Sequence, residues 1–446
     1  MRRGKAVDFK GGCVTITIAE ERAREQVAYA ADDQRHTIMR ILYLSQYFPP
    51  EVGATQTRAY EMARGLVRAG HHVTVIAEVP NHPRGVIRPE YRGRFCLREE
   101  LDGIEVLYLW VSASPDKNFY TRMAFYLSFM LSAALAGLFL VRGHYDLIYA
   151  SSPPLFVGGA ALIISYLRRI PLVFEVRDLW PESAVQLGEL SHPRAIRLAA
   201  WLEESCYRRA RHIVVVTKGI YDRLVERGCS TDQLTLIPNG ANTELYTPRP
   251  INQTLRRQLG IPPDQFVVIY AGLHGLAHGL ETALQAADQL RDRPDILFLL
   301  VGDGPQKAAL MQMAKEMALP NVRFHDAVPE PDLPGYVALA DVGLDTRRRI
   351  GISQGTLPVK MFSYMACGRP VLLSIEGEAV RLLDRAQAGV VVPPEKPEAL
   401  AQAILDLQAD PSAREAFGRR GRVFVEANYS RQGFACQLDQ LLRATV

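Results

Sequence analysis

The amino-acid sequence predicts an α/β protein with two doubly wound domains, each built around a parallel sheet. Strand-like apolar runs alternate with helix-like periodic segments from Ile41 onward, and the same alternation starts again at Phe266. A proline-containing segment over residues 238–263 separates the two series and is the best candidate for a linker. The chain of 446 residues is also longer than one hydrophobic core usually organises.

The composition is that of an ordinary globular protein and favours no nucleic-acid partner. Hydrophobic residues make up 48% and charged residues 22% of the chain, and the net charge is +4. This charge is too small to attract a polyanion strongly. The six cysteines lie far apart, without the spacing of a zinc site, so we expect reduced thiols, no metal and a cytoplasmic protein.

The N-terminal residues 1–38 are polar and show no periodicity, so we expect an extension without fixed structure. They lack the sustained apolar segment of a secretory signal. An apolar strand begins at Met39, which we hypothesise to be the biological start. A native N-terminus that retains residues 1–38 would contradict this hypothesis.

The first domain is predicted over residues 39–248. It opens with a strand at 41–47, a helix with apolar residues at helical spacing over 59–67, and a strand at 73–76. Ligands of such sheets bind beyond the carboxyl ends of the strands. The loop that contains Gly53 follows the first strand, so Gly53 is a candidate site residue, although an ordinary turn glycine would look the same.

An uncharged run from Met123 to Val141 is just long enough to cross a bilayer, at roughly 1.5 Å per residue. A crossing would put strands of one sheet on opposite sides of the membrane, so we do not expect it. Either the run is a buried helix, or it lies in the bilayer interface. A second apolar stretch, residues 155–167, could share the same face.

Polar side chains end the strand that begins at Val173. Arg177, Asp178 and Glu182 follow it directly, in the sequence Arg-Asp-Leu-Trp-Pro-Glu. Charges at the carboxyl end of a strand suit a site better than a core. Asp178 is therefore a candidate site residue, and the alternative is a surface ion pair between Arg177 and Asp178.

The second domain is predicted over residues 249–425, followed by a terminal helix over 426–446. A strand at 266–271 leads into a glycine-rich loop from Gly272 to Gly279 that holds His274 and His278, and a strand at 296–301 ends at Gly302. Such loops suit phosphate, because backbone N–H groups can approach it closely. The two histidines have no evident third partner for zinc.

In the stretch 351–371, proline and glycine occur at the positions expected for a ligand site at the junction of a loop and a helix. Pro358 fits the first helical turn, Gly368 fits the end of the helix, and Lys360 places a positive charge near the helix start. A helix start stabilises an anion. An ordinary amphipathic helix with a solvated lysine is the alternative.

The pattern Pro-x-Lys-x-Phe-x-Tyr-Met-Ala-x-Gly-x-Pro-Val at 358–371 resembles the donor-site helix of the retaining family-4 glycosyltransferases, especially bacterial O-antigen and capsule enzymes similar to N-acetylfucosaminyl transferases. The resemblance runs from about Met39 to the C-terminus. It implies the GT-B fold, with two Rossmann-like domains that face each other across a cleft. It also implies that the last helix crosses back to the first domain.

The resemblance implies a role for each candidate residue. Catalysis would involve Asp178 and Lys360, and Asp178 would orient or deprotonate the incoming hydroxyl group. The acceptor side would include Gly53, Arg177 and Glu182. The donor site would contain Gly272, His274, His278, Gly302, Lys360, Ser363 and Tyr364.

This chain departs from the family pattern at several donor-site positions. The family has two glutamates where this chain has Gly355 and Ser363, and an arginine and a lysine where it has Leu273 and His278. A carboxylate accepts hydrogen bonds from ribose hydroxyls more strongly than a serine does. We therefore expect weaker donor binding.

The function implied by the resemblance is sugar transfer from a nucleotide-sugar, expected to be UDP-linked, to a polyprenyl-linked acceptor in cell-surface polysaccharide biosynthesis, without a cofactor. We expect the protein to associate peripherally with the cytoplasmic face of the inner membrane through its first domain. One alternative is a nucleotide-sugar-binding or assembly protein with impaired catalysis. Another is a sugar-nucleotide epimerase.

Overall fold

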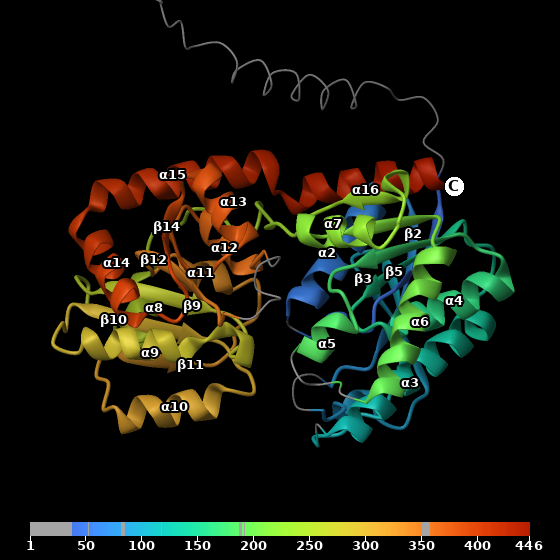
Figure 1. The fold of residues 1–446 in the computed structure, drawn as a ribbon, viewed down its shortest axis with the longest axis horizontal. Coiled ribbons are helices and arrows are strands. Elements are labelled where there is room, and N and C mark those ends of the chain that lie inside the picture. Colours follow the sequence, from blue (N-terminus) through green and yellow to red (C-terminus); the bar gives the residue numbers. More distant parts are fainter. Residues whose placement is uncertain are drawn as a thin grey trace, which may run out of the picture. The chain divides into compact units, whose positions relative to one another are not determined.

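The computed structural model describes residues 38–51, 53–81, 85–116, 118–186, 190, 192–349 and 357–446. The chain separates into two compact units, residues 1–38 and 39–446. The predictions for residues 1–37 and for Gly355 lie outside the described residues. The second unit holds two sheets, each flanked by helices (Figure 1). We call the parts built on these sheets the first lobe and the second lobe.

The first lobe is built on an eight-stranded sheet in the order β3-β4-β2-β1-β5-β6-β7-β8. Its pairs are parallel except for the hairpin of β3 and β4, which is antiparallel. The strands are β1 (Arg40–Leu44), β2 (His72–Glu78), β3 (Cys96–Leu101), β4 (Ile104–Leu109), β5 (Leu147–Ser152), β6 (Leu172–Val176), β7 (His212–Val215) and β8 (Leu234–Leu236).

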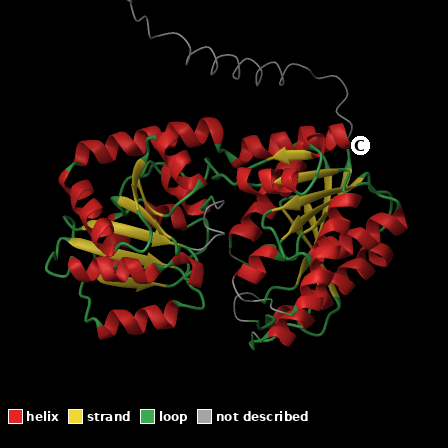
Figure 2. Cartoon of the chain, viewed as in Figure 1, coloured by secondary structure: helices red, strands yellow, loops and turns green. Residues whose placement is uncertain are grey.

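Helices cover this sheet, and their apolar side chains join its buried strands in one core (Figure 2). Central strands of a parallel sheet are buried on both faces, which explains their continuous apolar runs. The helices are α2 (Ala54–Arg68), α3 (Phe119–Leu135) with the π-helical turn η2 (Ala136–Leu140), α4 (Phe156–Arg168), α5 (Glu182–Gln186), α6 (Pro193–Arg209) and α7 (Lys218–Glu226), with short 3-10 turns η1 (Pro89–Tyr91) and η3 (Thr231–Gln233).

The second lobe is built on a six-stranded parallel sheet in the order β11-β10-β9-β12-β13-β14. The strands are β9 (Phe266–Ala271), β10 (Ile296–Val301), β11 (Val322–His325), β12 (Val342–Thr346), β13 (Val371–Ser374) and β14 (Gly389–Val392). The helices are α8 (Gln253–Gln258), α9 (Leu280–Gln289) after the 3-10 turn η4 (Leu276–His278), α10 (Lys307–Glu316), α11 (Leu333–Val337), α12 (Val359–Ala366), α13 (Glu378–Ala386), α14 (Pro397–Ala409) and α15 (Pro411–Asn428).

Each sheet has a point where the strand order changes direction. In the first sheet this point lies between β1 and β5, and in the second it lies between β9 and β12. The loops that leave these neighbouring strands run to opposite faces of the sheet, and ligands of doubly wound sheets bind in the resulting crevice beyond the carboxyl ends. The fold therefore indicates one candidate ligand-binding position in each lobe.

The C-terminal helix α16 (Arg431–Thr445) packs on α2 of the first lobe. The ring Nε2 of His71 lies 2.6 Å from Oδ1 of Asp439. A Cβ added to Gly65 of α2 would lie 2.3 Å from the Cβ of Ala435, so the two helices are in close contact there. The chain thus returns to the first lobe after completing the second.

Helix α3 takes up most of the uncharged run. It has features of both predicted alternatives, a buried helix and a helix in the bilayer interface. Residues Phe119–Leu140 are long and apolar enough to cross a membrane by length and composition. However, β4 before α3 and β5 after it belong to the same sheet, so this helix does not separate two sides of a bilayer. One side of α3 is buried against α4, and the other side is exposed.

Candidate functional site

The candidate site of the second lobe lies beyond the carboxyl ends of β9 and β12. The loop that follows β9 begins at Gly272, and β12 ends in Asp345 and Thr346, followed by Arg347. Helix α12 brings Lys360 to the same place. Parallel strands deliver these segments to one edge of the sheet at its switch point.

Lys360 and Arg347 both contact the buried carboxylate of Asp345. Lys360 Nζ lies 2.8 Å from Oδ1, and Arg347 Nε lies 3.5 Å from Oδ2. Burial would raise the pKa of Asp345, but the two cations hold it below its ordinary value. Burial also lowers the pKa of Lys360 to about 8, although Asp345 opposes the change. At neutral pH the cluster therefore carries two positive charges and one negative charge.

The glycines of this site let backbone segments approach one another closely. A Cβ on Gly272 would lie 3.1 Å from Cε of Lys360, and a Cβ on Gly302 would lie 1.9 Å from the carbonyl oxygen of Gly272. Both residues have a φ near +150°, which side chains rarely adopt. The loops after β9 and β10 therefore pack backbone to backbone, at Gly272 and Gly302.

The two histidines of the β9 loop lie beside this cluster and are neutral, His274 buried and His278 partly buried. Burial and the charge of Lys307 lower the pKa of His274 to about 4, while burial, Lys360 and Arg347 lower the pKa of His278 to about 2. Among the described residues, neither ring nitrogen of His274 has a hydrogen-bond partner, and neither does Nδ1 of His278. Neutral imidazoles can each donate one hydrogen bond and accept another.

The structure shows the surroundings of three residues of this segment, and it moves the start of the helix. Pro358 is the N-cap residue, with ψ of 122°, and the helix starts one residue later than expected. Tyr364 lies in the core, where its hydroxyl accepts a hydrogen bond from the Ala271 N–H at 2.9 Å, so it holds β9 in place. Ser363 is only 6% exposed, and its hydroxyl lies 3.5 Å from the carbonyl oxygen of Val359.

In the first lobe, Gly53 is the N-cap of α2 and Arg177 follows β6. Arg177 Nη2 donates to the carbonyl oxygen of Ala54 at 3.4 Å, which places the guanidinium beside the start of α2. Its Nε and Nη1 are buried without a hydrogen-bond partner among the described residues. Burial lowers the pKa of Arg177, although Glu175 is nearby.

A buried pair supports this position. Arg58 of α2 contacts Glu175 of β6 at 2.8 Å, and Glu175 also accepts hydrogen bonds from Tyr149 and Ser151. Burial would raise the pKa of Glu175, but Arg58 and Arg177 hold it below its ordinary value. The pair fixes α2 to the end of β6, and with it the distance between Gly53 and Arg177.

Asp178 and Glu182 lie four positions apart in the chain and have different surroundings. Asp178 is half-buried and accepts a hydrogen bond from the Ser183 hydroxyl at 2.8 Å. Glu182, in the first turn of α5, forms an ion pair with Arg223 at 2.7 Å.

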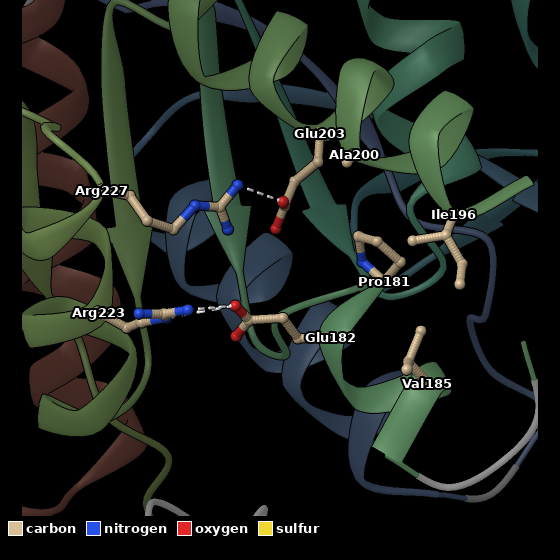
Figure 3. A pocket seen from close by; sticks show the side chains of 8 residues that line it. All are labelled: Pro181, Glu182, Val185, Ile196, Ala200, Glu203, Arg223 and Arg227. Atoms are coloured by element: carbon tan, nitrogen blue, oxygen red, sulfur yellow. Dashed lines mark hydrogen bonds and ion pairs between the residues drawn. The ribbon is translucent and has the colours of Figure 1, made fainter. Parts of the chain in front are cut away.

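Glu182 also lines a pocket of about 660 Å³ between α5, α6 and α7 (Figure 3). The pocket has an apolar wall and two ion pairs, Arg223 with Glu182 and Arg227 with Glu203, the latter at 2.6 Å. Its lining residues are Pro181, Glu182, Val185, Ile196, Ala200, Glu203, Arg223 and Arg227.

The structure brings the predicted residues together in two groups. Gly272, His274, His278 and Lys360 gather beyond β9 and β12, and Gly53 and Arg177 lie close together in the first lobe. Contacts such as the hydrogen bond from Thr57 Oγ1 to Glu330 at 2.7 Å link the two lobes. Among the described residues, no group of three or more histidines, cysteines and carboxylates could hold a metal ion.

Sequence reasoning missed the partners of these residues. Arg347 belongs to a run of three arginines, which suggests a solvated surface, yet its side chain is 13% exposed beside Asp345. The signal available was its position just after a strand that ends in a buried aspartate. Sequence reasoning also did not select Glu175, although a charged residue inside an apolar strand indicates a buried partner.

In a comparison with known families, both lobes match glycosyl transferase domains. Residues 53–240 match the family "Glycosyl transferase 4-like domain", and residues 251–424 match "Glycosyl transferases group 1". The Escherichia coli K12 protein WcaI, named as a colanic acid biosynthesis glycosyl transferase, is 26% identical over 377 residues, which cover 82% of this chain and 91% of that protein.

Solved structures share the fold. Sucrose-phosphate synthase from Thermosynechococcus elongatus superposes with a TM-score of 0.69 at 23% identity, covering 91% of this chain and 98% of the other. Anabaena HepE in complex with UDP-glucose gives 0.69 at 20% identity, covering 91% and 100%. The chain is therefore a glycosyltransferase of the GT-B fold, with a glycosyl transferase 4-like domain followed by a group 1 glycosyl transferase domain.

Proposed function

We propose that the protein transfers a sugar, with retention of anomeric configuration, from a UDP-sugar to a lipid-linked saccharide in the biosynthesis of a cell-surface polysaccharide. The observation that carries this proposal is the cation pair of Lys360 and Arg347 around buried Asp345, at the switch point of the second sheet. The narrower resemblance to N-acetylfucosaminyl transferases stays a prediction, as does the class of sugar, a hexose or an N-acetylhexosamine.

The donor side follows from the charge of the leaving group. When the bond between sugar and nucleotide breaks, the departing diphosphate gains negative charge. Lys360 and Arg347 would stabilise this charge by charge-assisted hydrogen bonds, and their low exposure strengthens the interaction. Asp345 would keep both cations aimed at the same place before the donor binds.

The nucleoside would meet the β9 loop. His274 and His278 are neutral and have unused hydrogen-bonding nitrogens, so they can pair with uncharged donor groups such as hydroxyls and ring atoms. The complex of HepE with UDP-glucose supports the choice of a uridine nucleotide. Retention would involve attack of the acceptor hydroxyl on the face from which the diphosphate leaves, assisted by a phosphate oxygen.

The acceptor side would be formed by the first lobe. The Arg177 guanidinium, with its free donors beside the start of α2, could hold an anionic group. Asp178 would orient the attacking hydroxyl or take its proton. The named role of WcaI in colanic acid biosynthesis supports a polysaccharide acceptor, and a polyprenyl-linked acceptor would place the enzyme at the cytoplasmic face of the inner membrane.

The test is a donor and acceptor screen with the purified full chain. UDP-linked and GDP-linked hexoses and N-acetylhexosamines would be incubated with polyprenyl diphosphate-linked saccharides, and products would be detected by mass spectrometry. The proposal expects one UDP-sugar to give a product one sugar heavier, with the donor's anomeric configuration by NMR. Transfer from GDP-sugars alone would contradict the UDP-linked donor, and transfer with inversion would contradict the retaining mechanism.

A second outcome of the same screen would favour a binding or assembly protein. Ser363 stands where the resembling enzymes have a carboxylate, and it is nearly buried. If calorimetry detected UDP binding but no donor gave transfer or hydrolysis, the departures at Leu273, His278 and Ser363 would have removed catalysis. Transfer by the wild-type chain excludes this alternative.

A further inference from the structure

The outward face of α3 is apolar where a surface helix is normally polar. Its exposed residues recur every three or four positions, at Tyr120, Ala124, Leu127, Leu131 and Leu135, and Phe139 of η2 continues the row. The inward face carries small residues, among them Ser132, Ala133 and Gly137. This is the reverse of the usual amphipathic pattern, so burial in the lobe does not explain the apolar row.

The row is part of a larger surface. Helix α4 packs against both α3 and α6, and the three helices lie side by side on the first lobe (Figure 1). A Cβ on Gly159 of α4 would meet Met130 of α3 at 2.5 Å and Leu202 of α6 at 3.7 Å, so the outer helices come close across it. Exposed large apolar side chains on the three helices and η2 are Phe119, Tyr120, Leu127, Leu131, Leu135, Phe139, Tyr166, Leu167, Leu198 and Trp201.

The same helices are strongly basic. Within these helices and the residues directly after them, the acidic residues are Glu203 and Glu204. Glu203 is buried and forms an ion pair with Arg227. The exposed part of this surface is therefore positive as well as apolar. Arg208 lies 3.9 Å from Glu204, and Arg168 and Arg209 donate to backbone carbonyl oxygens. The exposed arginines of the same segments are Arg142, Arg169, Arg194, Arg197, Arg208 and Arg211, and the partly buried ones are Arg122, Arg168 and Arg209.

We propose that this surface of α3, α4 and α6 docks on an anionic lipid bilayer, lying in the plane of the interface without crossing it. Leucine and phenylalanine side chains would enter the headgroup region, tyrosine and tryptophan would sit at its boundary, and arginines would pair with lipid phosphates. The single sheet that contains both β4 and β5 excludes a transmembrane path for α3. Charge favours a bilayer over a second copy of this chain, because two copies would oppose their arginines.

The inference deepens the proposed function, on which it rests for the choice of partner, since a lipid-linked acceptor resides in such a bilayer. The two are nevertheless separable in experiment. Nucleotide binding depends on the second lobe, whereas docking depends on exposed side chains of the first lobe.

The test is flotation of the full chain with vesicles of phosphatidylcholine alone or with added phosphatidylglycerol. We expect binding to the anionic vesicles, about tenfold weaker binding to the neutral ones, and loss of binding at high salt. The triple variant Leu131→Ser, Leu135→Ser and Phe139→Ser should bind the anionic vesicles about tenfold less, because its changes remove apolar contact with the bilayer.

Two further variants separate the contribution of charge from that of apolar contact and provide a control. Arg194→Gln with Arg197→Gln should remove the preference for anionic vesicles. Met311→Ser, on α10 of the second lobe, is a matched control because Met311 is as exposed as Leu135, 48% in each case, and it should bind like the wild type. UDP binding by calorimetry and the thermal unfolding midpoint should be unchanged in all of them.

Wild-type protein that stays unbound with both kinds of vesicle would overturn the proposal, and so would a triple variant that binds like the wild type. A wild-type dimer that the triple variant converts to a monomer in analytical ultracentrifugation would assign the face to a second copy instead. Loss of UDP binding with intact vesicle binding would count against the proposed function and leave the docking surface in place.

Discussion

Lys360 Nζ lies 2.8 Å from Oδ1 of Asp345, and the two residues come from different elements that meet beyond the carboxyl end of β12. Asp345 is fully buried, and Arg347 approaches its other oxygen. A buried carboxylate between two cations keeps them close together and charged, at the cost of part of the attraction that they would exert on an anionic ligand. The properties of this cluster lead to the first predictions.

Asp345→Asn should weaken UDP binding and move its pH dependence to lower pH. Asp345 raises the pKa of Lys360, whereas burial and Arg347 lower it. Without the carboxylate, Lys360 would lose its proton below pH 8. Calorimetric titrations with UDP from pH 6 to 9 would measure the shift, with Asp264→Asn on the surface as the control. A weaker affinity with an unmoved midpoint would mean that Asp345 acts only on the fold.

The pH dependence of the wild-type protein provides a second prediction. The pKa of Lys360 is about 8 in the folded chain, below its ordinary 10.5. UDP affinity should therefore fall as the pH rises through 8, and binding above pH 8 should take up a proton, which calorimetry in buffers of different ionisation enthalpy detects. Lys360→Arg should remove this dependence, because arginine stays charged.

The same depressed pKa affects stability with a definite sign. Between about pH 8 and 10.5 the unfolded chain binds this proton and the folded chain does not, so the contribution of Lys360 to the free energy of unfolding rises with pH across this window. Urea titrations of the wild type and of Lys360→Met at pH 8 and 10 would compare the two. A wild-type stability that falls more steeply than that of the variant would contradict the assignment.

Ser363→Glu should tighten UDP binding by about tenfold, since a hydrogen bond to a carboxylate contributes roughly 1.5 to 3 kcal/mol against about 1 kcal/mol for a neutral group. Ser363→Gln is the matched control, with the same length and no charge. Calorimetry on the three proteins would check the prediction. Equal affinities would show that position 363 does not face the ribose, in line with its low exposure.

Gly65→Ala should loosen the C-terminal helix from the first lobe. The added Cβ would lie 2.3 Å from that of Ala435, so α16 must shift. We expect a loss of about 1 to 3 kcal/mol in the free energy of unfolding, as for other overpacked contacts. Gly433→Ala is a suitable control, because a Cβ there meets no atom nearer than 4.0 Å. Equal urea midpoints for Gly65→Ala and the wild type would contradict this packing.

Much of the fold could be predicted from local patterns. Each buried strand is a short apolar run, and the proline-containing segment at 238–263 separates the two sheets. The hairpin of β3 and β4 was missed, although Asp102-Gly103 is a strong turn signal. Both residues have positive φ, which this turn requires. The segment before this turn, Cys-Leu-Arg-Glu-Glu-Leu at 96–101, carries three charged residues and is not the apolar run of a buried strand.

The site was harder to predict because its geometry depends on residues far apart in the chain. Spacing places Lys360, Ser363 and Tyr364 on one side of a helix, but it does not show that Tyr364 turns into the core. The contact between Arg58 and Glu175 joins residues 117 positions apart. In α3, apolar residues occur on all sides, so periodicity cannot show which row is left exposed.

The most direct test of this account is calorimetric titration of the full chain with UDP, in the wild type and in Lys360→Met. Lys315→Met, an exposed lysine of α10, is the matched control. The account predicts one UDP per chain and an affinity about 30-fold weaker in Lys360→Met, the effect of losing roughly 2 kcal/mol from a charge-assisted hydrogen bond. Equal UDP affinity in all three proteins would contradict the assignment of the donor diphosphate to Lys360.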